Sequence, residues 1–273
     1  MTDLTDRVDS EAVHVSLTIA ASPGTVWKFL SDGPSFASWL GAFAGQKPLA
    51  GTSVDPRVGG EIRVAFPGGN AAAGRITAME PQRRIAFTWG YTQESAGLPP
   101  GSSQVEITLT GIPEGTLVRL AHTGLPTEEM RKGHLGGWRH YLSMLSREAA
   151  ALQHGEKAER AFAAYFRAWA EPDEAARLQF LSEACEPEVR VRTSFACTDD
   201  VAKLSMHIAG SLRHMAGMTL AADGPVEILH GHARVRWRVS APDGKVAFRG
   251  EMFASLSPAG RLDRVVSFQD APA

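Results

Sequence analysis

Histidine, aromatic and carboxylate side chains are the residues of this chain that could bind a ligand or do chemistry. His134, Trp138, Tyr141 and Leu145 fall at i, i+4, i+7 and i+11, so a helix places them in one stripe. A stripe that joins an imidazole to aromatic rings either lines a ligand pocket or packs as a core. The spacing alone leaves both interpretations open.

A second histidine precedes this stripe, in a segment with the pattern of a strand. Over residues 115–123, Thr116, Val118, Leu120 and His122 share one face, because side chains alternate along a strand. A lone histidine on an apolar face is more often a core residue than a ligand contact. If a cavity separates strand and helix, His122 lines it together with the helix stripe.

Other large aromatic residues carry the same two interpretations, core packing or the wall of a cavity. The candidate ligand-binding residues are therefore Trp27, Trp39, Phe66, Trp89, His122, His134, Trp138 and Tyr141.

Glu251 is the candidate catalytic carboxylate, because it falls on a predicted strand of the second half. An acid that donates a hydrogen bond to a substrate must stay neutral, which requires burial to raise its pKa. Arg249 lies two residues away on the same strand face, and a nearby cation keeps a carboxylate ionised. We therefore favour a buried ion pair, made with Arg249 or with one of Arg234, Arg236 and Arg238.

Several classes of site are not expected. His207 and His214, like His230 and His232, have no third ligand at metal spacing, so we expect no metal. No glycine-rich phosphate loop or nucleophile elbow occurs, and we expect no cofactor. The net charge is −2 and neither half of the chain is basic, so a nucleic-acid partner is not expected.

Composition and the distribution of apolar residues indicate a cytoplasmic protein. No apolar run approaches the length of a membrane span, and the polar, acidic first residues do not have the pattern of a secretory signal. The two cysteines give no support for an oxidising compartment. We therefore expect neither a membrane partner nor export.

The pattern of the first half predicts one strand, two short helices, about six strands and a long helix. Ser22-Pro23 supplies an N-cap and a first-turn proline before a helix over 25–30, and a second helix covers 35–40. The long helix is predicted over about 127–153. His154-Gly155-Glu156 then ends one helical pattern before another begins, so it is the expected linker.

The second half repeats an order of helices followed by strands. Helices are predicted over 161–170, 174–184 and 199–215, and a strand lies near 188–195. Strands over 218–230, 233–240, 245–256 and 261–269 follow, with turns marked by glycine and proline. This pattern is typical of an α+β fold. We expect two domains, over residues 10–153 and 157–273.

The first half contains a series of motifs, in order over about 10–150: Ser22-Pro23, Val26-Trp27, Phe36, Trp39, Gly59-Gly60, Phe87 to Gly90, His122 to Pro126, His134 and Gly137-Trp138. With these residues it resembles the activator of heat-shock-protein ATPase homologues, a branch of the START-like (SRPBCC) helix-grip superfamily. The resemblance implies a curved antiparallel sheet that grips a long C-terminal helix, with a cavity between them, and some relatives bind hydrophobic small molecules.

The second half contains a series of motifs in order: Tyr165 to Trp169, Gly231 to Trp237, Asp243-Gly244, Gly250 to Phe253, Gly260-Arg261 and Val265 to Phe268. With these residues it resembles the SnoaL-like polyketide cyclases, which have the nuclear-transport-factor-like cone fold. The resemblance implies a cone-shaped pocket, a curved antiparallel sheet and a dimer formed through that sheet. In ketosteroid-isomerase-like relatives an acid stands where this chain has Glu251, but their base would fall near Arg192-Thr193-Ser194, where no acid occurs.

These observations favour a protein that binds small, largely apolar molecules in the helix-grip cavity, with the SnoaL-like domain as an accessory. A cyclase- or isomerase-type enzyme in the second domain is the alternative, and a co-chaperone-like interaction protein is the second alternative. We also expect a homodimer, formed through the sheet of the C-terminal domain over residues 217–270.

Overall fold

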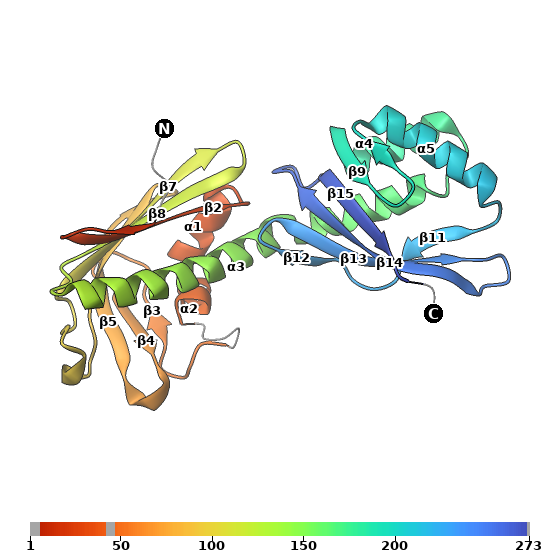
Figure 1. The fold of residues 1–273 in the computed structure, drawn as a ribbon. Helices are drawn as coiled ribbons and strands as arrows, with labels where there is room; N and C mark the ends of the chain where they lie inside the picture. Colours follow the sequence, from red (N-terminus) through yellow and green to blue (C-terminus); the bar gives the residue numbers. More distant parts are fainter. Residues whose placement is uncertain (1–5, 42–46, 272–273) are drawn as a thin grey trace. The chain divides into compact units, whose positions relative to one another are not determined.

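The computed structural model describes residues 6–41 and 47–271, and it divides into two units, residues 1–149 and 150–273 (Figure 1). The polar first residues, where no secretory signal was expected, lie mostly outside the described part. No helix among the described residues is long and apolar enough to cross a membrane. The cytoplasmic location stays a prediction.

An eight-stranded antiparallel sheet forms the first unit, with its strands in the order β1-β2-β8-β7-β6-β5-β4-β3. Strand β8 pairs with both of its neighbours along most of its length, so that Leu120 lies opposite Val15 on one side and Ile107 on the other. The strands are β1 (Arg7–Val8), β2 (Ala12–Ile19), β3 (Ser53–Val54), β4 (Glu61–Ala65), β5 (Ala71–Glu80), β6 (Arg84–Trp89), β7 (Ser103–Ile112) and β8 (Gly115–Thr123).

Two short helices, α1 (Pro23–Ser31) and α2 (Gly33–Leu40), join β2 to β3, as the sequence predicts. The Ser22 hydroxyl accepts a hydrogen bond from the Thr25 amide at 3.2 Å and caps α1. Asp32 caps α2 in the same way, through the Ser35 amide at 3.0 Å. The caps explain why both helices begin where they do.

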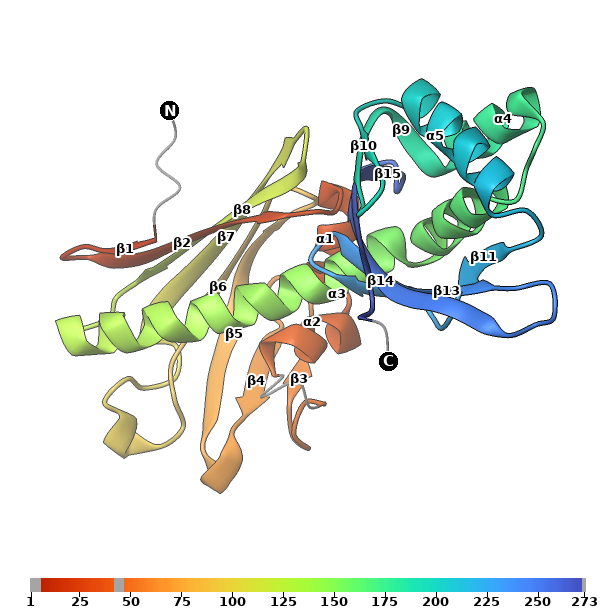
Figure 2. The same cartoon turned by 45° about the vertical axis from the view of Figure 1, so that its right-hand side comes forward.

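The long helix α3 covers Glu128–Ala168 without a break, so the linker predicted at His154-Gly155-Glu156 is wrong. A glycine inside a helix costs about 1 kcal/mol relative to alanine. Here that cost is outweighed by packing on both sides, since Ala149, Ala150 and Ala158 are fully buried. The first part of α3 lies across the sheet of the first unit (Figure 2), and its last part belongs to the second unit.

The second unit combines the end of α3, the helices α4 (Glu174–Ala184) and α5 (Val201–His214), and one mixed sheet. Its main strand order is β10-β9-β15-β14-β13-β11, and β12 also pairs with β13. Among the described strands, β15 and β9 pair in parallel and the others antiparallel. The strands are β9 (Cys185–Arg192), β10 (Cys197–Thr198), β11 (Thr219–Ala222), β12 (Glu227–Leu229), β13 (His232–Ser240), β14 (Val246–Leu256) and β15 (Leu262–Gln269).

Each unit has its own hydrophobic core. In the first, the side chains of Trp138, Leu142 and Leu145 on α3 pack against the sheet. In the second, Phe162 and Tyr165 on α3 pack with α4, α5 and one face of the sheet. The structure is therefore an α+β protein, in which a helix-grip unit is followed by a cone-like unit.

Candidate functional site

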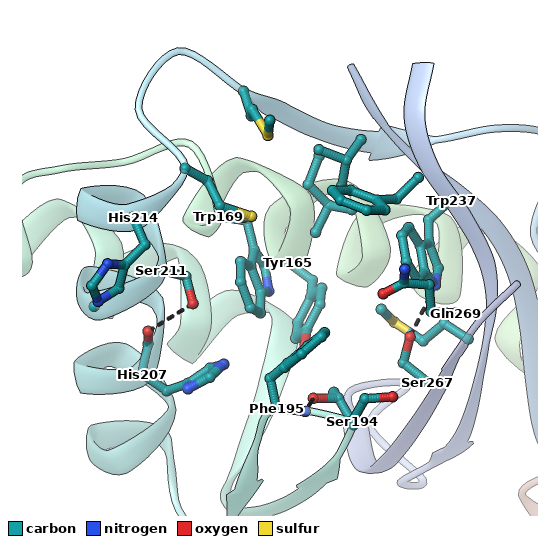
Figure 3. Close-up of a pocket in the computed structure, with 18 residues that line it drawn as sticks. Tyr165, Trp169, Ser194, Phe195, His207, Ser211, His214, Trp237, Ser267 and Gln269 are labelled. Atoms are coloured by element: carbon teal, nitrogen blue, oxygen red, sulfur yellow. Dashed lines mark hydrogen bonds between the residues drawn. The ribbon is translucent and has the colours of Figure 1, made fainter. Parts of the chain in front are cut away.

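A pocket with a volume of about 760 Å³ lies within the second unit (Figure 3). Helices α3 and α5 form one wall, and strands β11, β13, β14 and β15 form the other. The lining residues are Tyr165, Trp169, Thr193, Ser194, Phe195, His207, Gly210, Ser211, His214, Met215, Met218, Leu220, Trp237, Val239, Phe248, Met252, Ser267 and Gln269.

Helix α5 presents one face to this pocket. His207, Gly210, Ser211 and His214 fall at i, i+3, i+4 and i+7 and all line it. Their neighbours Leu204 and Ile208 are fully buried in the core, so the pocket-lining face lies beside the apolar stripe. A Cβ atom added at Gly210 would meet nothing within 4 Å, which leaves open space above this turn of the helix.

The sheet wall is built around the indole of Trp237. A Cβ atom at Gly250 would lie 2.4 Å from this ring, so only glycine leaves room for it on the neighbouring strand. The indole N–H of Trp237 donates to Ser267 Oγ at 2.9 Å. Trp237 therefore offers the pocket an apolar face with its polar atom already bonded.

Tyr165 and Trp169 stand at the helix wall with their polar atoms unbonded. Tyr165 is 0% exposed, and its ring centroid lies 6.4 Å from that of Trp169. Neither Tyr165 Oη nor Trp169 Nε1 has a hydrogen-bond partner among the described residues, although both atoms are buried. Burial raises the pKa of Tyr165, and the nearby Trp169 N–H opposes that rise without completing a hydrogen bond. The tyrosine is a neutral hydroxyl.

His207 lies next to Trp169, with the two ring centroids 5.8 Å apart. Partial burial lowers its pKa, so the imidazole is neutral near pH 7. No aspartate or glutamate occurs among the described lining residues. The pocket is therefore mostly apolar, with polar groups at a few points.

Glu251, the predicted catalytic carboxylate, faces away from this pocket. Strand β14 alternates, so Met252 lines the pocket while Glu251 points to the outer face of the sheet. There its carboxylate contacts Arg236 at 3.2 Å and Arg234 at 3.9 Å, with the side chain 32% exposed. The ion pair with an arginine is confirmed, but it is not buried. Arg249 pairs instead with Asp223 at 3.4 Å.

A smaller pocket of about 350 Å³ lies in the first unit, beside the first turns of α3. Five of the sequence-predicted ligand-binding residues line it: Phe66, Trp89, His134, Trp138 and Tyr141. The remaining lining residues are Tyr91, Met130, Gly133 and Gly137.

The other three predicted residues do not line that pocket. Trp39 is 0% exposed, stacks on Phe36 and donates its indole N–H to the Phe29 carbonyl at 2.8 Å. Trp27 is half-buried and packs against the same core. His122 is also 0% exposed and lies behind Trp138. These residues support the pocket wall or the core without facing open space.

The hydrogen bonds of His122 fix its tautomer. Trp138 donates its indole N–H to His122 Nδ1 at 2.9 Å, so Nδ1 carries no proton. His122 Nε2 therefore donates to Ser103 Oγ at 2.8 Å, and that hydroxyl donates to the Trp89 carbonyl. Burial and the nearby His134 lower the pKa of His122 to about 3. His122 is a neutral, fully bonded part of the core.

His134 has the opposite tautomer. Its Nδ1 donates to the Met130 carbonyl at 2.8 Å, because a carbonyl oxygen can only accept. Its Nε2 then accepts from the Tyr91 hydroxyl at 3.2 Å. Burial lowers the pKa of His134 and raises the pKa of Tyr91, so both groups are neutral in the pocket wall. Tyr91 is a lining residue that the sequence analysis missed.

The resemblance of the second half implies a pocket there, but the residues that line it were not among the predicted site residues, although the sequence contains a signal for them. His207, Gly210, Ser211 and His214 form a helix face that is neither apolar nor strongly charged. A polar stripe with a glycine, directly beside an apolar stripe, is the pattern that could have indicated a cavity wall.

Comparison with family models supports the resemblance of the first half. Residues 20–150 match the family model described as "Activator of Hsp90 ATPase homolog 1-like protein". This match falls within the helix-grip unit apart from its last residue, and it spans just under half of the chain. No curated protein matches the chain significantly.

Solved structures with similar folds include relatives of both kinds. A protein of Agrobacterium tumefaciens, described as belonging to the SnoaL-like family, is 23% identical; the match covers 42% of this chain and 99% of that one, with a TM-score of 0.40. A Rhodobacter sphaeroides protein is 24% identical; the match covers 54% of this chain and 98% of that one, with a TM-score of 0.44. The Aha1 dimer of Colwellia psychrerythraea is 20% identical; the match covers 50% of this chain and 92% of that one, with a TM-score of 0.38. The likeness concerns the fold alone.

Proposed function

We propose that this protein binds small, largely apolar molecules, and that the pocket of the second unit is its main site. The observation that carries the proposal is the volume of about 760 Å³ behind a mostly apolar lining. Ligand pockets for small molecules span roughly 300–1,000 Å³ and combine apolar walls with a few polar groups. The helix-grip pocket favoured by the sequence is about 350 Å³, and we assign it the lesser role.

Gly210→Leu tests this proposal, because it places a side chain where Gly210 leaves open space. The probe is N-phenyl-1-naphthylamine, an apolar dye whose fluorescence rises when it leaves water. The wild-type protein should bind it saturably, one molecule per chain, and Gly210→Leu should abolish that binding. Leucine favours a helix more than glycine does, so the variant should fold.

Gly136→Leu is the matched control, since Gly136 is an exposed glycine of α3 and a Cβ atom added there would meet nothing within 4 Å. It makes the same chemical change outside the second unit and should leave binding intact. Equal binding by wild type and Gly210→Leu would place the site elsewhere, and an absence of binding by wild type would contradict the proposal.

A second candidate function is proton transfer of the isomerase type, and the neutral imidazole of His207 in the pocket favours it. A neutral histidine is a competent general base near pH 7, and no carboxylate is needed for that step. The test measures by NMR the rate at which the α-protons of 2-tetralone exchange with deuterated water. Wild type should accelerate exchange and His207→Ala should not. If wild type gives only the uncatalysed rate, binding remains and this enzyme function fails.

The outer face of the second unit's sheet supports a further proposal, a homodimer. Phe253 and Phe268 are 42% and 61% exposed, and their ring centroids lie 6.4 Å apart. Exposed aromatic clusters of this kind are commonly covered by a second copy related by a two-fold axis. Sedimentation equilibrium should give a dimer mass, and Phe253→Lys should give a monomer. The co-chaperone role has only the family description to support it.

A further inference from the structure

The smaller pocket, beside the first turns of α3, is lined mainly by aromatic rings. We infer that this pocket takes a quaternary ammonium group, which the rings hold by cation–π contacts. The inference concerns a second site and does not rest on the function proposed for the main pocket. Five of the nine described residues that line the smaller pocket are aromatic: Phe66, Trp89, Tyr91, Trp138 and Tyr141.

The five rings follow one another along the pocket wall. Neighbouring ring centroids lie 5.5–6.3 Å apart, and the planes of neighbouring rings meet at angles of 46° to 80°. Rings at such angles do not form a parallel slot for a flat ligand, but a compact, rounded group can contact several of them at once. A trimethylammonium group has that shape. The order of the rings is Phe66, Tyr91, Trp89, Trp138 and Tyr141.

Two glycines of α3 leave room for such a group. Gly133 and Gly137 both line the pocket and lie four residues apart, on one face of the helix. A Cβ atom added at either position would meet nothing within 4 Å. The pocket volume of about 350 Å³ falls within the range of small-molecule sites, and it accommodates a trimethylammonium group with a short chain.

The electrostatics of the wall favour a cation. The face of an aromatic ring is negative, so it attracts a positive charge placed over it. No lysine or arginine occurs among the described lining residues, so no positive side chain of the wall competes for the rings. Burial lowers the pKa of His134, and its neutral imidazole does not repel a cation. Burial also raises the pKa of Tyr141 to about 12, so its ring is that of a neutral phenol.

The hydrogen bonds of the helix wall indicate which class of cation fits. A primary ammonium or guanidinium group carries N–H donors, and each donor needs an acceptor when it leaves water. The Met130 carbonyl already accepts from His134 Nδ1 at 2.8 Å, and His134 Nε2 accepts from the Tyr91 hydroxyl at 3.2 Å. A quaternary ammonium group has no N–H, so none of its atoms loses a hydrogen bond. Its charge is spread over methyl groups that contact the rings directly.

The test compares choline with 3,3-dimethylbutan-1-ol, which has nearly the same shape but a neutral carbon in place of the charged nitrogen. Ligand-observed NMR titrations of the methyl protons give both dissociation constants. Wild type should bind choline more tightly by on the order of tenfold, because cation–π contacts strengthen when the ion is partly desolvated.

Substitutions of the half-buried rings test whether the preference comes from the aromatic wall. Tyr141→Leu and Phe66→Leu each remove one ring and keep an apolar side chain, so each should reduce the preference for choline severalfold. Binding of the neutral alcohol should stay within about twofold in both variants. Tyr141→Phe is the control, because it keeps the ring and should keep the preference. A preference that survives both leucine substitutions unchanged would overturn the inference.

Three glycine substitutions locate the site. Gly137→Leu places a side chain in the open space at the helix wall and should abolish binding of both probes. Gly136→Leu, at an exposed neighbour that does not line the pocket, should bind choline like wild type. Gly210→Leu alters the main pocket and should also leave choline binding unchanged, which separates this inference from the proposed function. Equal affinities of wild type for the two probes, no binding of choline, or undiminished binding by Gly137→Leu would each contradict the inference.

Discussion

Acidification should destabilise the first unit through His122, and the size of the effect can be worked out from the structure. His122 is 0% exposed. Its burial lowers its pKa from 6.5 to about 3, and the nearby His134 contributes a smaller part of this shift. Protonation of His122 would also place an N–H at Nδ1, directly opposite the Trp138 indole N–H that donates to this atom at 2.9 Å. The folded state therefore resists a proton that the unfolded state takes up readily.

The direction in which stability changes with pH follows from proton linkage. Between pH 6.5 and pH 3 the unfolded chain binds the His122 proton and the folded protein does not, so stability rises with pH across this window. The contribution of neutral His122 to the free energy of unfolding is fully present above pH 6.5 and is lost as the pH falls. With about 1.4 kcal/mol per pKa unit, the loss reaches about 2 kcal/mol at pH 5.

Urea unfolding followed by tryptophan fluorescence, at pH 7.5, 6 and 5, measures this effect. His122→Leu is the comparison, because it lacks the titrating group; it should be less stable at pH 7.5 but should lose less stability on acidification. The difference between the two pH dependences should be about 2 kcal/mol at pH 5. Identical pH dependences for wild type and His122→Leu would refute the assignment of His122 as a neutral, bonded core histidine.

Three other predictions concern stability and backbone order. Glu251→Ala should cost at most about 1 kcal/mol in urea unfolding, because its ion pair with Arg236 is partly exposed; a cost above about 3 kcal/mol would show that the pair is buried. Trp138→Ala should lower the free energy of unfolding by about 3–5 kcal/mol. Trp138→Phe should lower it clearly less, since the phenyl ring keeps most of the packing and loses only the hydrogen bond to His122. Equal losses for the two variants would contradict the packing argument. Limited proteolysis should spare residues 150–158, which are helical, and early cleavage there would restore the linker that the sequence predicts.

Local patterns predicted most of the elements. The alternation from Thr116 to His122 gave a strand, and all four residues of that face are buried. The cap at Ser22 indicated the start of α1, because a side-chain oxygen that bonds a free amide is a local event. The break at Gly155 was wrong, because the packing that keeps the helix continuous comes from residues far away in the sequence.

The pockets were harder to predict, because a cavity depends on what several elements leave unfilled. The stripe of His134, Trp138 and Tyr141 was placed correctly on a helix, and all three line the smaller pocket. Whether Trp39 faced a cavity or the core could not be decided from spacing, since both environments are apolar. Glu251 was predicted on the correct strand, but the face that meets the pocket depends on the tertiary packing of that strand.

Native mass spectrometry of the freshly purified protein tests the central claim most directly. We predict that wild type carries one small molecule per chain, or takes up one when N-phenyl-1-naphthylamine is added, and that Gly210→Leu carries none. Gly136→Leu should behave like wild type. The account is contradicted if wild type shows no bound molecule under either condition, or if Gly210→Leu carries the same added mass as wild type.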